Sequence, residues 1–236
     1  MKRRFDPAMP ELMDRPQPVT AELETDLHNL RQLNRYFGSY RLIEHFLRRW
    51  IRPGNQLRIL DLATGSGDIP RLVVDYARTI GAAVRVNAVD QQPSTLKIAR
   101  QLSADYPEID FLESDVLTFQ REPYDVVLCS LALHHFAETD AIQLLRRSRD
   151  LSKRYVLVAD LRRGWLATAG VSLLTALFFR EPMTRTDARL SAERSFTFGE
   201  FHSLAERAGW KNFGHANFSF ARQAIWMETT LPEKGL

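Results

Sequence analysis

The chain has 236 residues, of which 44% are hydrophobic, so it is long enough and apolar enough to bury one substantial core. Its formal net charge is only +3, which argues against the basic stripe of a nucleic-acid-binding protein. Cys129 is the single cysteine, and one cysteine excludes both a disulfide framework and a cysteine-based zinc site. These features favour a single domain with added segments, in a reducing cytoplasm.

The N-terminus shows no secretory signal, because the basic start at residues 1–4 is followed by Phe5-Asp6-Pro7 and not by an apolar stretch. We therefore expect a loose N-terminal arm and a cytoplasmic location.

Two helices are predicted next. Leucines at three- and four-residue spacing predict a helix that starts after Thr20 and stops at Gly38. A second apolar stripe over residues 42–51 predicts another helix. We expect residues 1–54 to form the arm and a helical cap, and residues 55–236 to form the main domain.

The stretch from Arg58 to Asp68 runs an apolar strand into a glycine turn, with Asp61 at the end of the strand. Gly65 and Gly67 suit positive backbone dihedrals and a close approach of a ligand to the backbone. This pattern predicts a nucleotide-like cofactor at the carboxyl end of the first strand. The alternative is a tight strand-to-helix connection without a ligand.

Three further strands are predicted, each with chemistry near its end. Residues 84–89 end at Asp90, which would accept hydrogen bonds from a ribose diol or else be a solvated loop acid. Residues 111–116 bring Asp115 to a position where it would accept from an adenine amino group. Residues 124–136 form an almost wholly apolar strand, which suits burial in a parallel sheet.

In this order the motifs resemble the class I S-adenosylmethionine-dependent methyltransferases, and more closely the ubiquinone and menaquinone biosynthesis branch. Ala63 replaces the first glycine of the usual loop, a variant that this branch also shows. The segment from Phe196 to Trp210 resembles the branch's penultimate helix, and Thr197 with Glu200 forms a predicted capping box. The resemblance covers roughly residues 55–230.

The resemblance implies an α/β fold with a Rossmann-like seven-stranded sheet, an N-terminal helical cap and a helical insertion after the fifth strand. The fifth strand is predicted at residues 155–160, the insertion at about 162–196 and a terminal hairpin around residues 218–228. A dinucleotide is disfavoured because Asp68 stands at the helix start, where its carboxylate would repel a pyrophosphate.

The run from Trp165 to Phe179 contains no charged residue and is too short to span a bilayer comfortably. It suits a buried helix, the apolar wall of an acceptor pocket, or a peripheral membrane contact. The polar piece from Asp187 to Ser195 suits a loop over the site or a solvated linker.

Candidate site residues follow from these patterns and from the resemblance. The predicted cofactor-binding residues are Asp61, Ala63, Thr64, Gly65, Gly67, Asp68, Asp90, Gln91, Asp115, Val116, Ser130 and Leu131. The predicted substrate residues are Asn34, Arg35, Tyr40, Arg41, Asp160 and Arg194. His134 and His135 are the candidate general bases, although a histidine here also packs beside the cofactor in the similar family. No metal is expected, because no ligand spacing such as His-x-x-x-His occurs.

The predicted function is S-adenosylmethionine-dependent methylation of a hydrophobic small molecule, most simply O-methylation of a phenolic, polyketide or quinone-like acceptor. The segments Glu11–Pro16 and Asn34–Gly38 resemble a bacterial group associated with type III polyketide pathways. A nucleic-acid acceptor is disfavoured, because Ser130-Leu131-Ala132-Leu133 stands where an Asn/Asp-Pro-Pro-aromatic motif would be. The alternatives are C-methylation of a quinone-type ring, or a catalytically inactive cofactor-binding partner.

Overall fold

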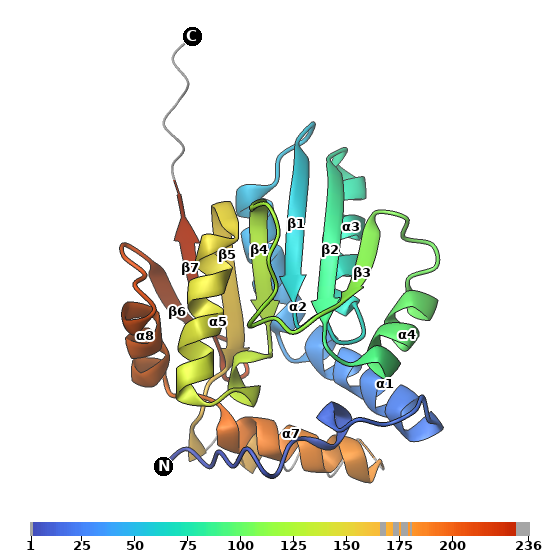
Figure 1. Ribbon diagram of the computed structural model, residues 1–236, viewed down its shortest axis with the longest axis vertical. Helices are drawn as coiled ribbons and strands as arrows, with labels where there is room; N and C mark the ends of the chain where they lie inside the picture. The colour runs from blue at the N-terminus through green and yellow to red at the C-terminus, as the bar shows by residue number, and fades with distance from the viewer. Residues whose placement is uncertain (1, 166–168, 172–174, 176–178, 180, 230–236) are drawn as a thin grey trace.

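The computed structural model describes residues 2–165, 169–171, 175, 179 and 181–229. Its centre is a seven-stranded sheet in the order β3-β2-β1-β4-β5-β7-β6, in which β7 runs antiparallel to β5 and to β6 (Figure 1). The strands are β1 (Gln56–Leu62), β2 (Ala83–Asp90), β3 (Ile109–Glu113), β4 (Tyr124–Ser130), β5 (Ser152–Leu161), β6 (Gly214–Phe218) and β7 (Arg222–Glu228). The seven-stranded Rossmann-like sheet and the terminal hairpin predicted from the sequence are confirmed.

Helices cover both faces of this sheet. They are α1 (Ala21–Tyr36), α2 (Ser39–Trp50), α3 (Asp68–Ile80), α4 (Pro93–Leu102), α5 (Glu138–Asp150), α7 (Pro182–Arg194) and α8 (Phe198–Arg207), with short 3-10 helices η1 (Leu12–Asp14) and η2 (Leu133–His135). The two predicted N-terminal helices are present, and Thr20 caps α1 by accepting from the backbone N–H of Leu23.

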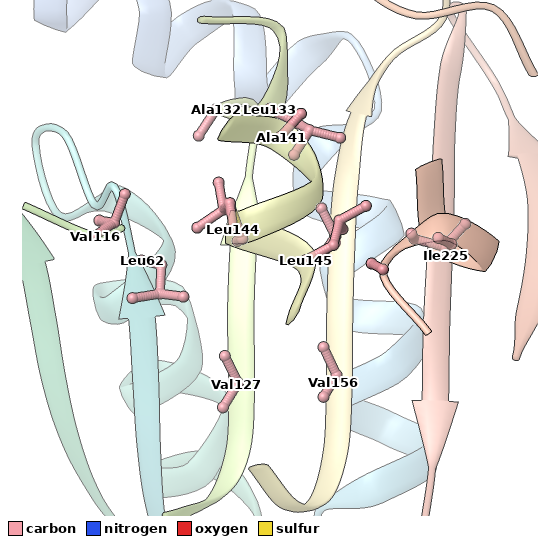
Figure 2. Packing of buried hydrophobic residues seen from close by; sticks show 14 of the residues in the cluster. Leu62, Val116, Val127, Ala132, Leu133, Ala141, Leu144, Leu145, Val156 and Ile225 are labelled. Atoms are coloured by element: carbon pink, nitrogen blue, oxygen red, sulfur yellow. The ribbon is translucent and has the colours of Figure 1, made fainter. Parts of the chain in front are cut away.

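The central parallel strands bury side chains on both faces because helices lie on either side. On one face, residues of β1, β4 and β5 pack with α2 and α3 in one core cluster. On the other face, Val127 and Val156 share a cluster with Leu144 and Leu145 of α5 (Figure 2). The cluster continues to α8, whose predicted capping box between Thr197 and Glu200 is present.

Two predicted strands end earlier than expected. The apolar run after Tyr124 leaves the sheet at Ser130, because Leu131 takes a left-handed φ of 55° that no strand accommodates. The chain then forms η2, so both histidines lie on a short helix and not on a strand. β3 likewise ends at Glu113, so Asp115 lies in the loop that follows it.

The polar piece expected to be a loop or linker from Asp187 is instead the second half of α7. Its buried side includes Asp187, Ala188 and Ser191, so these two polar residues face the protein, whereas Arg189 faces the solvent. The N-terminal arm is not loose either. It runs beside α7 at the carboxyl ends of the parallel strands (Figure 1), and Asp187 accepts from the backbone N–H groups of Leu12 and Met13 at 2.8 and 3.0 Å.

Much of the uncharged run from Trp165 to Phe179 lies outside the described residues, including Leu173 and Leu174. Of its described part, Thr175 is buried and Trp165 is exposed. Within the described part of the chain, no helix is long and apolar enough to cross a membrane.

Candidate functional site

A cavity of about 790 Å³ opens at the carboxyl ends of the parallel strands. It is bounded by the β1–α3 loop, by α1, by η2 and by the N-terminal arm, with α7 contributing Ala188 and Ser191. This volume is within the range of roughly 300–1,000 Å³ typical of small-molecule sites, and the carboxyl edge is where ligands of parallel α/β sheets bind.

The β1–α3 loop needs glycine at two positions for two different reasons. Gly65 and Gly67 have φ values of 53° and 73°, as the sequence predicted. A Cβ on Gly67 would lie 2.8 Å from the ring of Phe111, whereas one on Gly65 would meet no protein atom within 4 Å. Of these two glycines, Gly65 lines the cavity and Gly67 does not. Ala63 lines the cavity as well, and it has a left-handed φ of 55°. Such strained residues persist where the surrounding structure holds them and often mark functional sites.

Asp61 lies behind this loop and does not line the cavity. Its carboxylate accepts from the hydroxyl of Thr64 at 2.6 Å and is 2% exposed. Burial, with smaller contributions from Asp68 and Asp90, raises the pKa of Asp61 to about 8. Asp61 therefore anchors the loop from within the core.

Asp90 joins two loops at the end of β2. Its carboxylate accepts from the backbone N–H of Gly65 at 2.9 Å and from that of Gln92 at 3.0 Å. Burial raises the pKa of Asp90, and these two hydrogen bonds oppose that shift. Asp90 lines the cavity, and each of its oxygens retains a lone pair for a ligand.

Asp68 begins α3, where the helix dipole favours a carboxylate. It accepts from the side-chain amide of Asn34 at 3.0 Å and from the hydroxyl of Tyr40 at 3.1 Å. These contacts tie the predicted substrate residues Asn34 and Tyr40 to the loop. Arg35 and Arg41 are exposed and lie outside the cavity lining.

His134 is buried in the middle of η2, and Asp160 of β5 makes two contacts with it. The imidazole Nδ1 lies 2.7 Å from one carboxylate oxygen, and the backbone N–H of His134 donates to the other at 2.9 Å. Because a carboxylate only accepts, Nδ1 carries the hydrogen, and Nε2 of the neutral ring is the atom with the lone pair. Nε2 lies 3.8 Å from Oε1 of Glu11.

His135 repeats this arrangement with a carboxylate from the arm. Its Nδ1 lies 2.6 Å from Oδ2 of Asp14, and its Nε2 lies 4.0 Å from Oε2 of Glu11. Burial disfavours the charged ring, but Glu11, Asp14 and Asp160 together outweigh it and raise the pKa of His135 to about 10. His135 therefore retains its extra proton at neutral pH.

Glu11 is 2% exposed and accepts from the hydroxyl of Ser191 at 3.0 Å. Nη1 of Arg194 lies 3.9 Å from its carboxylate and forms an ion pair with it. Arg194 itself does not line the cavity. Sequence reasoning missed Glu11 and Asp14 as site residues. The available signal was the Glu11–Pro16 motif, which indicated a related group of proteins but gave no position in the fold.

The structure brings most of the predicted residues together. Those that line the cavity are Asn34, Ala63, Thr64, Gly65, Asp68, Asp90, Gln91, Val116, Ser130, Leu131, His134 and His135. Those that lie outside its lining are Arg35, Tyr40, Arg41, Asp61, Gly67, Asp115, Asp160 and Arg194. Asp115 is exposed and accepts from the backbone N–H of Leu117 at 2.8 Å, so it caps its own turn.

Comparison with known proteins gives matches consistent with this geometry. Residues 59–154 match the family described as methyltransferase domain. An 87-residue stretch is 34% identical to 2-phytyl-1,4-naphtoquinone methyltransferase of Thermosynechococcus vestitus and covers 37% of each chain. A 157-residue stretch is 29% identical to ribosomal RNA small subunit methyltransferase H of Nostoc punctiforme and covers 61% of this chain and 49% of that protein. These alignments thus span half or less of either relative.

The fold is also similar to the crystal structure of magnesium protoporphyrin IX methyltransferase of Synechocystis with bound SAH. The TM-score is 0.56 at 16% identity, over 91% of this chain and 90% of the other. Residues 59–154 thus match a methyltransferase domain, and the strand order of the sheet is that of the class I S-adenosylmethionine-dependent methyltransferase fold. Within that class, the naphtoquinone methyltransferase match supports the ubiquinone and menaquinone biosynthesis branch.

Proposed function

We propose that this chain transfers the methyl group of S-adenosylmethionine to a hydroxyl group of a hydrophobic phenolic, polyketide or quinone-like acceptor. The observation that carries the proposal is that the glycine loop with Asp90 and the pair His134–His135 line one cavity. A methyl donor held at the loop and an acceptor held at the histidines would share that space.

The loop end of the cavity suits the donor. Asp68 and Asp90 are acidic, and S-adenosylmethionine has a cationic ammonium and a cationic sulfonium but no phosphate. Asp90 retains acceptor capacity for a ribose diol after its two backbone contacts. A dinucleotide fits less well, since its pyrophosphate would meet Asp68 at the first residue of α3.

The histidine end suits the acceptor. In methyl transfer, the acceptor oxygen forms a bond to the methyl carbon as the carbon–sulfur bond breaks and the sulfur keeps the electron pair. Alignment of the two reactants can supply on the order of 7–11 kcal/mol. A phenol has a pKa near ~10, so it reacts faster when the site favours the phenolate. We assign that catalytic role to His134 and His135.

Apolar side chains support a hydrophobic acceptor. Met13, Leu27, Leu30 and Phe37 line the cavity beside the polar groups. The similarity to a naphtoquinone methyltransferase favours the same class of acceptor. The chain is also similar to an RNA methyltransferase. An RNA acceptor is nevertheless disfavoured, because the net charge is only +3 and the N-terminal arm lines the cavity.

Isothermal titration with S-adenosylmethionine, its demethylated product and NAD tests the donor. We expect the first two to bind and NAD not to bind, and a protein that binds only NAD would overturn the proposal. A series of phenols with longer alkyl chains then tests the acceptor. The value of kcat/KM should rise with chain length until the cavity is full. The corresponding activation free energy should fall by about 25 cal/mol for each Å² of apolar surface that the acceptor buries.

Analysis of the product separates the remaining alternatives. Loss of the phenolic hydroxyl signal in the NMR spectrum of the product indicates O-methylation, and its retention with substitution on the ring indicates C-methylation. Binding of the donor without turnover of any phenol or quinone would favour a catalytically inactive partner protein.

The exposed side of Trp165 favours one further contact. Trp165 is 71% exposed at the start of the uncharged run, and an exposed tryptophan is typical of membrane interfaces. We propose peripheral membrane contact there. Co-sedimentation with phospholipid vesicles tests it, and Trp165→Ser should reduce the bound fraction.

A further inference from the structure

Two carboxylate-held imidazoles and a buried glutamate meet at one point of the cavity. One nitrogen of His134, one nitrogen of His135 and one carboxylate oxygen of Glu11 lie within 4.8 Å of one another. All three residues line the cavity. We propose that Glu11, His134 and His135 bind a divalent transition-metal ion such as Zn²⁺, with an open coordination position toward the acceptor.

The contacts around the histidines are those of metal ligands. A histidine that binds a metal ion almost always donates its other ring N–H to a carboxylate, a carbonyl or a water, which fixes the ring orientation. Asp160 holds Nδ1 of His134 at 2.7 Å, and Asp14 holds Nδ1 of His135 at 2.6 Å. Both rings therefore turn Nε2 toward Glu11, and a bound ion would displace the proton that His135 holds on this atom at neutral pH.

The distances fit an ion after a small adjustment of the side chains. Oε1 of Glu11 lies 3.8 Å from Nε2 of His134, and Oε2 lies 4.0 Å from Nε2 of His135. Zinc–ligand bonds of ~2.0–2.2 Å in tetrahedral geometry place neighbouring ligand atoms somewhat closer than this. Glu11 would therefore approach each histidine by a few tenths of an ångström, and the two imidazole nitrogens would also draw together from a separation of at most 4.8 Å.

The local charge also favours a cation. Three carboxylates, those of Glu11, Asp14 and Asp160, contact the two imidazoles directly. The guanidinium of Arg194 pairs with one of these carboxylates, that of Glu11, at 3.9 Å, and also donates to the backbone carbonyl of Met9. Two imidazoles with one carboxylate form a donor set that suits zinc and other first-row divalent ions.

The position of the ion deepens the proposed function, and this step rests on that function. An acceptor phenol that binds the ion gives up its proton to solvent water, because the ion stabilises the phenolate. The phenolate oxygen then bonds to the methyl carbon as the carbon–sulfur bond breaks and leaves neutral S-adenosylhomocysteine. The histidines would thus act on the hydroxyl through the ion.

Cobalt titration of protein freed of metal with EDTA tests the site directly. We expect one equivalent of Co²⁺ to bind with a saturable visible absorption band, and Zn²⁺ to displace it. Glu11→Gln and His135→Ala should weaken binding at least tenfold, and Asp14→Asn should weaken it roughly 10–100-fold. His28→Ala is the matched control, because His28 is exposed and outside the cluster. The affinity of this variant for Co²⁺ should equal that of the unaltered protein.

A second measurement on the unaltered protein guards against variants that fail to fold. Zn²⁺ should shift the imidazole ¹⁵N signals of two histidines and leave that of His28 in place. The absence of saturable binding to the unaltered protein, or equal binding by folded Glu11→Gln and His135→Ala variants, overturns the proposal. Titration of the metal-free protein with S-adenosylmethionine reports separately on the proposed function, since the loop residues are not among the three ligands.

Discussion

Nδ1 of His134 lies 2.7 Å from Oδ1 of Asp160, so a histidine that follows β4 is oriented by a carboxylate at the end of β5. The other oxygen of Asp160 accepts from the backbone N–H of the same histidine. One carboxylate therefore sets both the position and the tautomer of His134 at the edge of the cavity.

Asp160→Asn should lower kcat for methyl transfer by at least tenfold and leave the affinity for S-adenosylmethionine nearly unchanged. The amide no longer requires a donor at Nδ1, so the tautomer of His134 is no longer fixed. Steady-state kinetics and titration calorimetry measure the two effects. Asp105→Asn is the control, because Asp105 is exposed. An unchanged kcat would show that His134 has no part in the reaction.

Asp90→Asn should weaken S-adenosylmethionine binding by roughly 1.5–3 kcal/mol, the range for a hydrogen bond to a charged group. The melting temperature should fall slightly, because the carboxylate also accepts from Gly65 and Gln92. Calorimetry and a circular-dichroism melt separate the two effects. Asp115→Asn should change neither by much, since Asp115 is exposed and outside the cavity lining. A larger loss of S-adenosylmethionine affinity in Asp115→Asn than in Asp90→Asn would contradict the assignment of Asp90 to the cofactor site.

Gly65→Ala and Gly81→Ala form a matched pair. Both glycines have a positive φ, 53° and 70°, and an added Cβ meets no protein atom within 4 Å at either position. Each variant should lose about 1–2 kcal/mol of stability through the left-handed conformation. Only Gly65→Ala should also weaken S-adenosylmethionine binding, because Gly65 lines the cavity and Gly81 ends α3. Equal affinity in the two folded variants would mean that the loop does not approach the cofactor.

Asp26→Asn should stabilise the protein at neutral pH. Asp26 is fully buried, and burial, with help from Glu11, Glu181 and Asp14, raises its pKa to about 6. The pKa of an aspartate in the unfolded chain is ~3.9. The stability that protonated Asp26 gives is therefore present below about pH 4 and is lost as the pH rises through 6.

At pH ~7 the free energy of unfolding of the variant should therefore exceed that of the unaltered protein by roughly 3 kcal/mol, and at pH ~4 by little. Urea denaturation at the two pH values measures the difference. Asp105→Asn should show no such pH dependence, and an equal gain at both pH values would contradict the assignment.

Asp187→Ala should release the N-terminal arm. Asp187 accepts from the backbone N–H groups of Leu12 and Met13, and without it both donors lose their partner. Limited proteolysis should cut before α1 faster, and turnover of the acceptor should fall because Glu11 and Asp14 are no longer held at the histidines. A variant with unchanged cleavage and turnover would show that other contacts hold the arm.

The sequence alone determined where the central parallel strands begin, the position of the glycine loop and the helix α8. Apolar periodicity and the positive φ of glycine are local properties, so the strands of the central sheet, Gly65, Gly67 and the capping box at Thr197 could be predicted from a few neighbouring residues. Asp90 was predicted at the end of β2 for the same reason.

Only the tertiary structure decided the arrangement of the acceptor end. Glu11 and Asp14 come from η1 in the N-terminal arm and the histidines from η2 after β4, and no spacing rule relates positions so far apart. Their contact depends on α7, a segment whose polar residues predicted a loop, although Asp187 and Ser191 face inward and hold the arm. These buried polar groups have partners distant in the chain, which is why sequence patterns found the cofactor loop but not the carboxylates around the histidines.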